Sequence, residues 1–288
     1  MRFSLKQWLL ICFSVLVVTG CSLPQDQEKI KNLQSENDAL RTENQQMKEK
    51  LAALEAADNA MIENPLTPSP AVFSDVTTDV PTADMINDLA QLKVFEEVGI
   101  TGNFEPYKPI TRAEYITWLY HAYNAMHPAE KQLRFDPSYV VPYSDIQPTD
   151  PAYKYVQAFG SAGFAVGYDD KTFKPNKTLT REEMIAIKYP VDGGTNGSKY
   201  SSNLETLFSD DKLIDHRFHG YVNADEANKD AKPRGNNAQR AFGPIKTFKP
   251  KEPVQRFQAA ATLWQTDVNN TYHADFALGR KKSLSPGH

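Results

Sequence analysis

The sequence has very little cysteine: two residues in 288, Cys12 and Cys21. Neither a disulfide framework nor a cysteine-based metal site is therefore expected. A basic excess is also absent, because 32 Lys and Arg residues face 36 Asp and Glu residues. This balance argues against a nucleic-acid-binding protein, which needs a concentrated basic face. After the first 20 residues no apolar run is long enough to cross a membrane.

The first 21 residues predict the compartment. Arg2 and Lys6 form a short basic region, and the almost wholly apolar stretch 8–18 follows. That stretch is too short to span a bilayer core of about 30 Å as a helix. A basic flank, a short apolar core and small residues before a cleavage site are typical of a secretory signal peptide, here residues 1–20. Its removal would leave 30 basic against 36 acidic residues, a net charge of −6.

The end of this segment, Val18-Thr19-Gly20-Cys21, resembles the bacterial lipobox, in which the cysteine receives diacylglycerol and becomes the new N-terminus. The resemblance implies an exported lipoprotein held to a membrane by lipid on Cys21. The alternative is an ordinary signal peptide followed by a chance cysteine. Ser22 is not the aspartate that retains lipoproteins in the inner membrane in enteric-type sorting. The expected location is the periplasmic face of the outer membrane, or the outer face of the cytoplasmic membrane in a thick-walled host.

Residues 21–57 are expected to form the lipidated N-terminus and a coiled coil. From about residue 25 the chain is polar, yet its apolar residues recur every three and four positions. Such a seam is buried only against another helix, so a parallel homo-oligomer, a dimer or a trimer, is predicted. A single solvated helix or a disordered stalk is the alternative. The heptad places Ile30, Asn37, Asn44 and Leu51 at position a, and Leu33, Leu40, Met47 and Leu54 at position d.

Two further segments have no apolar period. Residues 58–71 contain Pro65, Pro68 and Pro70 and are predicted to be an extended linker. Residues 277–288 are basic and punctuated by Gly and Pro, and are predicted to be a flexible tail.

Between the linker and the tail, three units repeat, over residues 72–126, 142–192 and 207–266. Each unit opens with an aromatic-Ser-Asp triplet and later carries a Phe-x-Pro triplet, with an arginine eight residues after that phenylalanine. In order, the triplets are 73–75, 143–145 and 208–210, the phenylalanines Phe104, Phe173 and Phe248, and the arginines Arg112, Arg181 and Arg256.

Each unit is predicted to be a helix, a loop and a second helix. In the second unit, Thr149-Asp150-Pro151 is typical of a helix start, and Gly163 suits the C-terminal cap. The second helix should begin at Thr180, with Glu183 at capping-box spacing. Thr111 and Glu114 repeat this box in the first unit. The fold class expected is mainly α: an N-terminal coiled-coil helix, then a pseudo-threefold array of helix-loop-helix repeats.

These motifs resemble the S-layer homology (SLH) domains, whose hallmarks are Phe-Ser-Asp-Val, Gly-Tyr-x-Asp-Gly-x-Phe-x-Pro and Ile-Thr-Arg-Ala-Glu. Residues 110–114 reproduce the last motif in full, and residues 167–175 the middle one, with Lys171 where the family has its second glycine. The resemblance extends over about residues 72–266. It implies three units whose grooves bind anionic polysaccharide attached to peptidoglycan, often carrying ketal-linked pyruvate.

The third unit departs from the pattern. It carries about ten extra residues, and Val254-Gln255-Arg256-Phe257-Gln258 replaces the Thr-Arg-Ala-Glu motif. The arginine is kept, but the threonine and the glutamate are lost, so ligand binding by this unit is in doubt. In other respects the unit resembles the extended third repeat of cyanobacterial members.

The candidate polysaccharide-binding residues are the three arginines and the two capping pairs. An arginine at a helix N-terminus combines a fork of donors with the positive end of the helix dipole, which suits a carboxylate. Thr111, Glu114, Thr180 and Glu183 are fully explained by capping, so their contact with ligand is the weaker expectation. The opening aspartates, Asp75, Asp145 and Asp210, are expected to bond local backbone instead.

Catalysis is not expected. The histidines have no zinc-type spacing beyond His216-x-x-His219, and no pair of carboxylates is predicted to flank a cleft as a glycosidase requires. No cofactor or metal is expected. The sequence thus predicts a non-catalytic lipoprotein that tethers a membrane to the cell wall through polysaccharide or peptidoglycan. The alternative is a structural adaptor that has lost sugar binding and docks a protein partner in the periplasm.

Overall fold

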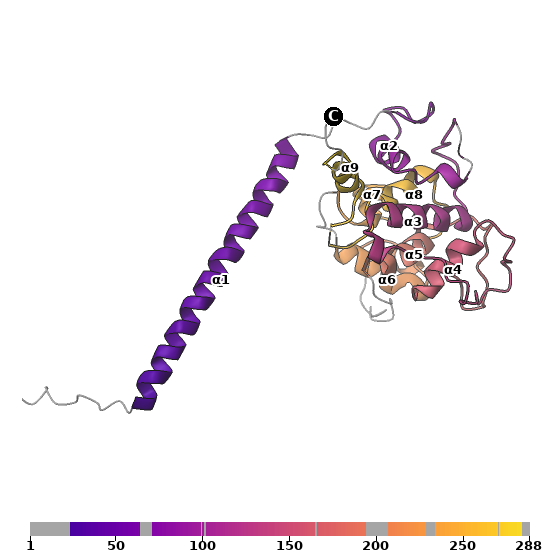
Figure 1. Ribbon diagram of the computed structural model, residues 1–288. Coiled ribbons are helices and arrows are strands. Elements are labelled where there is room, and N and C mark those ends of the chain that lie inside the picture. Colours follow the sequence, from indigo (N-terminus) through magenta and orange to yellow (C-terminus); the bar gives the residue numbers. More distant parts are fainter. Residues whose placement is uncertain are drawn as a thin grey trace, which may run out of the picture. The chain divides into compact units, whose positions relative to one another are not determined.

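The computed structural model describes residues 24–63, 71–98, 100, 102–164, 166–193, 207–228, 234–269 and 271–283. The expected signal peptide and Cys21 lie outside these residues, as do the prolines of the expected linker. The chain divides into two compact units, Met1–Leu66 and Thr67–His288. Within the described residues, no helix combines the length and the apolar character that crossing a membrane requires. The structure is mainly α, as expected (Figure 1).

The first compact unit contains one long helix, α1 (Pro24–Glu63). Its apolar residues lie in water: Ile30, Leu33, Leu40 and Met47 are each more than half exposed. An amphipathic seam left in solvent loses the stabilisation that burial of these side chains against a partner would supply. The helix also runs six residues beyond the expected end at 57, because Asp58 to Glu63 contain no proline and a single asparagine. The expected linker boundary at 58 is therefore wrong.

The second compact unit contains the three predicted helix-loop-helix units. The first has α2 (Ala83–Gln91), η1 (Glu96–Val98) and α3 (Arg112–Met126), followed by η2 (Ala129–Lys131). The second has α4 (Tyr153–Ser161) and α5 (Arg181–Gly193). The third has η4 (Asp211–Leu213), α6 (His216–Ala227), α7 (Asn237–Phe242) and α8 (Arg256–Leu263). Its extra residues therefore include an additional short helix, α7.

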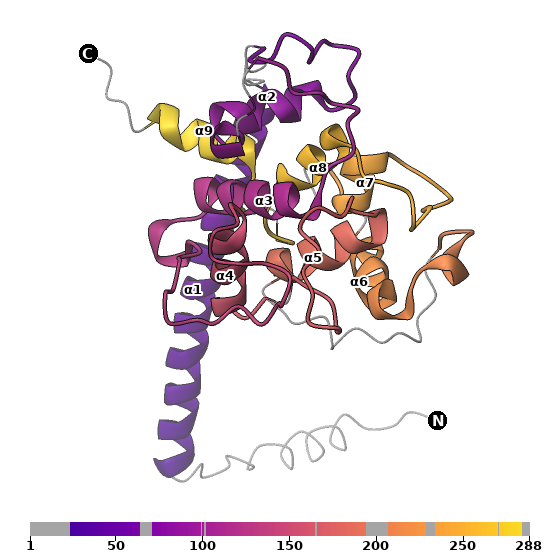
Figure 2. The same cartoon turned by 90° about the vertical axis from the view of Figure 1, so that its right-hand side faces the viewer.

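The three units, whose helices are labelled in Figure 2, are joined in a ring by backbone hydrogen bonds between one residue of each. The amide of Ile110 donates to the carbonyl of Val254 at 2.9 Å, Val254 donates to Leu179 at 2.9 Å, and Leu179 donates to Ile110 at 3.0 Å. All three side chains are fully buried. These three cyclic bonds give the predicted pseudo-threefold relationship a backbone basis.

The helices pack in the same cyclic order. The first helix of each unit lies on the second helix of the preceding unit: α4 on α3, α6 on α5, and α2 on α8. Because α2 belongs to the first unit and α8 to the third, this packing brings the two ends of the array together. The buried aromatic residues Phe95, Phe104 and Trp118 fill the core of the first unit, with ring centroids 4.8 to 5.5 Å apart.

The C-terminal residues are better ordered than expected. Helix α9 (Ala274–Ser283) occupies most of the segment predicted to be a flexible tail from 277. The amide of Ala274 donates to the carbonyl of Trp264 at 2.9 Å, and both Ala274 and Ala277 are buried where α9 meets α2 and α3. The sequence pattern misses this helix because its buried residues are small alanines.

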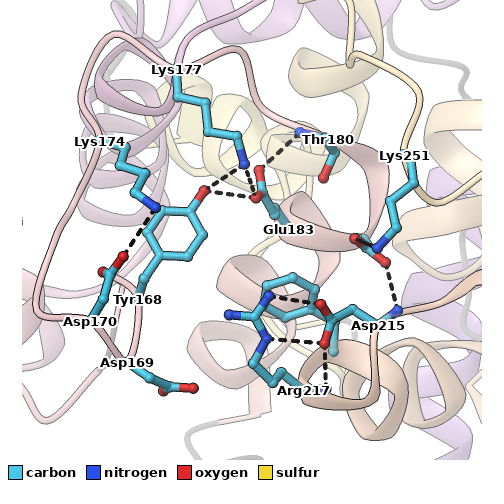
Figure 3. A pocket seen from close by; sticks show the side chains of 12 residues that line it. Tyr168, Asp169, Asp170, Lys174, Lys177, Thr180, Glu183, Asp215, Arg217 and Lys251 are labelled. Atoms are coloured by element: carbon cyan, nitrogen blue, oxygen red, sulfur yellow. Dashed lines mark hydrogen bonds and ion pairs between the residues drawn. The ribbon is translucent and has the colours of Figure 1, made fainter.

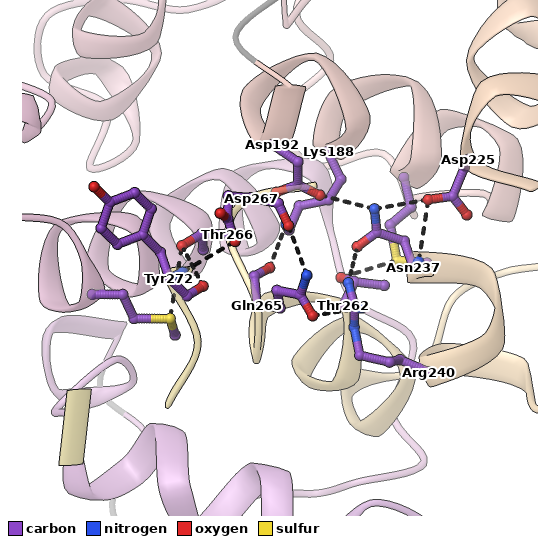
Figure 4. A network of polar contacts seen from close by, with 12 residues as sticks. Lys188, Asp192, Asp225, Asn237, Arg240, Thr262, Gln265, Thr266, Asp267 and Tyr272 are labelled. Carbon is purple, nitrogen blue, oxygen red and sulfur yellow. Dashed lines mark hydrogen bonds and ion pairs between the residues drawn. The ribbon is translucent and has the colours of Figure 1, made fainter. Parts of the chain in front are cut away.

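A buried polar network joins α5, α6 and α7 to the end of α8 (Figure 4). The ammonium of Lys188 is fully buried, pairs with Asp192 and donates to the Gln265 carbonyl at 2.7 Å. Asn237 donates to both Asp192 and Asp225 at 2.9 Å. Burial lowers the pKa of Lys188 and raises that of Asp192, and their mutual attraction opposes both changes. Removing one member would leave an uncompensated buried charge, so this network fixes how the third unit sits on the second.

Candidate functional site

Each of the three predicted arginines reaches into the neighbouring unit. Arg112 in unit one donates from Nε to the Phe173 carbonyl of unit two at 2.7 Å. Arg181 in unit two donates to the Phe248 carbonyl of unit three at 3.1 Å, and Arg256 in unit three donates to the Phe104 carbonyl of unit one at 2.9 Å. The three side chains therefore close a second ring around the backbone ring. Contact between these arginines and ligand stays a prediction.

The surroundings of each guanidinium differ. Arg112 is 2% exposed, donates also to the Val166 carbonyl, and lies over the ring of Tyr168 at 4.3 Å. Arg256 donates to the carboxylates of Glu105 at 3.0 Å and Glu114 at 2.7 Å. Burial lowers the pKa of Arg112, but a guanidinium keeps its proton in proteins. The arginines are therefore fixed charges held by carbonyls and carboxylates.

The opening aspartates bond backbone in the same way in all three units. Their partners lie 28 to 39 residues further along the chain, so the expectation of local backbone partners is wrong. Each carboxylate accepts hydrogen bonds from the amides of the phenylalanine in the Phe-x-Pro triplet and of the next residue: Asp145 accepts from Phe173 N at 2.7 Å and from Lys174 N at 2.8 Å. That next residue has left-handed backbone in every unit, with φ of 56° at Glu105, 57° at Lys174 and 55° at Lys249. The equivalent bonds join Asp75 to Phe104 and Glu105, and Asp210 to Phe248 and Lys249.

The capping box forms in full at α3, in part at α5 and in altered form at α8. The box predicted at α5 is incomplete because the Thr180 hydroxyl is buried without a hydrogen-bond partner among the described residues. Thr111 and Glu114 make a reciprocal capping box at α3. At α5 the Thr180 amide donates to Glu183 at 3.2 Å. At α8 the Gln255 amide donates to Gln258 at 2.9 Å, so an amide side chain replaces the glutamate as the acceptor. The third unit therefore loses the charge of this motif but keeps its cap.

Gly167 and Lys171, both in the middle motif, differ in backbone conformation. Gly102 has φ of 89°, but Gly167 is not in the left-handed region. A Cβ on Gly167 would lie 2.1 Å from the Tyr143 ring, so this glycine is needed for a close approach. Lys171, at the family's second glycine, takes the left-handed conformation with φ of 60°.

One cleft, of about 440 Å³, lies between units two and three (Figure 3). We call it the charge-balanced cleft because its cations are paired with carboxylates of the protein. Its cations are paired: Lys177 contacts Glu183 at 2.6 Å, Lys174 contacts Asp170 at 3.2 Å, and Arg217 contacts Asp215 at 2.7 Å. The Tyr168 hydroxyl donates to Glu183 at 2.7 Å. Four cationic and five anionic residues line this cleft: Lys174, Lys177, Arg217 and Lys251 against Asp169, Asp170, Glu182, Glu183 and Asp215.

A second cleft, of about 470 Å³, lies where unit three meets units one and two, and we call it the basic cleft. Its lining includes Arg181, Arg240 and Lys249, and among the described residues no carboxylate lines it. Phe242 contributes an aromatic face, with the Arg181 guanidinium 4.2 Å from the ring centroid. Glu252, just outside the lining, pairs with Arg181 at 3.0 Å and Lys249 at 2.8 Å.

The contrast between the clefts follows from the altered motif of unit three. In the other two junctions, the motif glutamate of one unit faces the arginine of the unit before it: Glu183 lies 4.0 Å from Arg112, and Glu114 lies 2.7 Å from Arg256. At Arg181 the corresponding residue is the neutral Gln258. One carboxylate is thus missing from this junction, and the cleft is left basic.

The described residues offer no metal site: no group of three or more His, Cys, Asp and Glu side chains among them is placed to hold an ion. His219 bonds Asp211 at 2.8 Å, whereas His216 is exposed beside Asp215.

Comparison with known families assigns two of the three units. Residues 72–116 and 142–185 match the S-layer homology domain. The first and second units are therefore similar to S-layer homology repeats. The third unit lies outside the matched residues, although its hydrogen bonds repeat those of the two S-layer homology units.

Three characterised proteins share this similarity. They are an amylopullulanase of Thermoanaerobacterium thermosulfurigenes, 32% identical over 142 residues, and the exoglucanase XynX of Acetivibrio thermocellus, 30% identical over 142 residues. Cell surface glycoprotein 1 of Acetivibrio thermocellus is 31% identical over 134 residues. The matches span 49%, 49% and 45% of this chain but only 7%, 12% and 5% of those proteins. Such small shares carry no enzymatic activity over to this chain.

Proposed function

We propose that this protein is a non-catalytic cell-envelope lipoprotein that tethers a membrane to the cell wall. Lipid on Cys21 would hold one end, α1 would serve as a stalk, and the ring of three units would bind the wall. The order of the parts supports the proposal, since an anchor, a rod of 40 helical residues and a wall-binding array follow one another. S-layer homology repeats and similarity to a cell surface glycoprotein point to the cell envelope.

The wall ligand that we propose is an anionic polysaccharide linked to peptidoglycan, with pyruvate ketals as one source of its charge. The basic cleft is the observation that carries this proposal. No carboxylate lines it among the described residues, its cations Arg181 and Lys249 share the single partner Glu252 outside the lining, and its aromatic face suits a sugar ring. The charge-balanced cleft is a poorer anion site because each ligand carboxylate would compete with a carboxylate of the protein.

The candidate residues have different places in this proposal. Arg181 lines the basic cleft and is our first choice for direct contact with the ligand, together with Lys249. Thr180 and Glu183 line the charge-balanced cleft. Arg112 lines a small adjoining cleft beside Tyr168. Ligand contact by Arg256, Thr111 and Glu114 is retained as a weaker proposal, because ring closure and capping already engage these residues.

Two substitutions of opposite sign test the basic cleft. Lys249→Gln removes an exposed cation without touching the arginine ring, so affinity for the released polysaccharide should fall about three- to tenfold. Glu252→Gln frees both Arg181 and Lys249, so affinity should rise. Lys108→Gln, an equally exposed lysine of the first unit, is the control. Equal affinity of all four proteins, measured by calorimetry, would exclude the basic cleft.

Arg112→Ala and Arg181→Ala are poor tests of binding. Each change would leave a buried carbonyl without its donor and would open the ring, so lost retention could mean lost folding.

We propose also that the third unit is a diverged S-layer homology repeat that completes the array. Its aspartate, arginine and ring bonds repeat those of the matched units. A chain cut after residue 206 should then expose the apolar face of α5 and bind a hydrophobic dye. A shortened chain with native stability would make the third unit a separate module.

The stalk is proposed to pair with a second copy of itself, parallel and in register. In that arrangement Asn37 and Asn44 each face their own copies, which satisfies both amides. Position g of one helix also faces position e of the other: Glu36 faces the partner's Arg41, and Glu43 faces the partner's Lys48. Both charge pairs are attractive, which favours a parallel homodimer over a single helix.

Sedimentation equilibrium tests the stalk. The native chain should sediment as a dimer, and Leu40→Asp, which buries a charge in the seam, should give a monomer with an unchanged ring. Gln45→Asp, at the outward position b, is the matched control. A monomeric native chain would overturn the proposal, and a trimer would correct the number of copies.

The membrane anchor is tested by labelling cells with palmitate and separating the two membranes. Label that is lost on Cys21→Ser and that fractionates with the outer membrane is expected. Label in the cytoplasmic membrane would move the tether to that membrane. If the chain is anchored but crosslinks to one stoichiometric protein and binds no polysaccharide, the adaptor function replaces the tether.

A further inference from the structure

A separate pocket lies between units one and two. It holds about 120 Å³, and we call it the tyrosine pocket. Four elements build it: η1 supplies Glu97, α3 supplies Tyr120 and His121, and α4 supplies Lys154 and Tyr155; Phe135 comes from the loop after η2. None of these residues is shared with the lining of the two clefts described above.

Its aromatic walls are set at angles to one another. The Tyr120 and Tyr155 rings lie 5.0 Å apart at 52°, and the His121 and Tyr155 rings lie 5.3 Å apart at 66°. Phe135 is 51% exposed. The backbone of Leu133, two residues before Phe135, is held by the Asn124 side chain, which accepts from its amide at 2.8 Å and donates to its carbonyl at 3.0 Å. A large apolar ring is thus presented to solvent at the rim of a concave, aromatic-lined pocket.

The polar atoms of the pocket bond one another in a chain. The Tyr155 hydroxyl donates to Glu97, the His121 Nε2 lies 3.2 Å from that hydroxyl, and Lys154 Nζ lies 3.1 Å from the same carboxylate. The charges of Glu97 and Lys154 cancel. Burial lowers the pKa of His121, so the imidazole is neutral at pH 7. The pocket therefore combines aromatic faces, donors and acceptors with no net charge.

We propose that the tyrosine pocket binds one neutral pyranose ring of a wall glycan. The apolar C–H face of a pyranose suits the tyrosine and phenylalanine rings, and its hydroxyls suit the carboxylate and the ammonium group. Charge balance favours a neutral sugar here, whereas the basic cleft favours an acidic one. The proposal rests on the proposed function only for the source of the sugar, which is either the glycan strand of peptidoglycan or the polysaccharide attached to it.

The test titrates the purified full-length chain, in detergent, with two probes: chitotetraose for the glycan strand, and polysaccharide released from sacculi by acid. Phe135→Ala and Tyr120→Ala should weaken binding of one probe about five- to tenfold. Val140→Ala, an 81% exposed position in the same loop that does not line the pocket, should change nothing. Glu97→Gln, which removes the acceptor charge but not the shape, should weaken the same probe.

The outcomes separate this proposal from the proposed function. Dependence on Phe135 with chitotetraose identifies the glycan strand, and dependence with released polysaccharide identifies that polymer. Loss of binding in Lys249→Gln alone, with Phe135→Ala equal to the native chain for both probes, would overturn the tyrosine pocket and leave wall binding intact. A loss in Phe135→Ala alone would support the pocket and contradict the basic cleft. Failure of both probes to bind the native chain would overturn the pocket outright.

Discussion

Arg256 donates from Nη1 to the carbonyl oxygen of Phe104 at 2.9 Å, across 152 residues of sequence. This bond joins the last unit to the first, and Arg112 and Arg181 make the corresponding bonds at the other two junctions. An arginine placed eight residues after each phenylalanine is therefore a means of closing a ring, whatever else it contacts.

Replacing Arg256 by alanine should destabilise the array by about 2 to 3 kcal/mol, because a buried carbonyl and Glu114 both lose a charged donor. Denaturant unfolding followed by circular dichroism measures the change. Arg134→Ala is the matched control, since Arg134 is exposed and donates to the carbonyl of Ala129 in the nearby η2. Similar midpoints for the two variants would mean that the arginine ring contributes little to stability.

Asp145→Ala should cost about 1.5 to 3 kcal/mol, because two backbone amides at Phe173 and Lys174 lose an ionised acceptor. Asp75→Ala and Asp210→Ala should behave alike, since their bonds have the same geometry. Asp136→Ala, at an exposed turn, should change stability by less than about 0.5 kcal/mol. A large effect in only one unit would contradict equal roles for the three aspartates.

Stability should fall as the pH drops from about 6.5 to 4, partly because of His127. The His127 ring lies between the rings of Tyr123 and Tyr272, with centroid distances of 3.7 and 3.9 Å. Burial lowers its pKa to about 4. Between these pH values the unfolded chain binds a proton that the folded chain excludes, so protonation favours unfolding. Thermal melts across this range should be flatter for His127→Gln than for the native chain.

His216→Gln is the control for this pH effect, because His216 is exposed and should leave the profile unchanged. Carboxylates titrate mainly below pH 5, so the slope of melting temperature against pH is compared between pH 5 and 6.5. Identical slopes for the native chain and His127→Gln would show that the stacked histidine is not the source.

Replacing Asn37 and Asn44 together by leucine should raise the melting temperature of the stalk and mix its oligomeric states. Asparagine at position a weakens the seam but specifies its register, so its removal exchanges specificity for stability. Sedimentation equilibrium and helical melts measure the two effects. A single unchanged species with a lower melting temperature would contradict the proposed register.

The repeats and their helix starts could be predicted from the sequence because each rests on a local signal. Thr111 with Glu114 is a short-range capping pattern, and α3 begins directly after that threonine. The aspartates were expected to bond backbone, and they do so 28 to 39 residues away rather than within a turn. The type of partner was predictable, whereas its position depends on how the loop folds back.

Two features of the clefts depend on contacts between units and were not predictable from one unit at a time. The sequence shows that Gln258 replaces a glutamate, which suggested a weakened third unit. Only the cyclic packing shows that this position faces Arg181 of the preceding unit, so that the loss of charge makes the cleft basic. The tyrosine pocket likewise joins residues from 97 to 155, and no motif marks it.

The central claim, that the array holds the cell wall through linked polysaccharide, is tested most directly by co-sedimentation with purified sacculi. Intact sacculi should retain the full-length chain, and sacculi stripped of polysaccharide by acid should retain much less. Lys249→Gln should reduce retention on intact sacculi and Glu252→Gln should increase it. Equal retention on intact and stripped sacculi, with no effect of either substitution, would contradict the account.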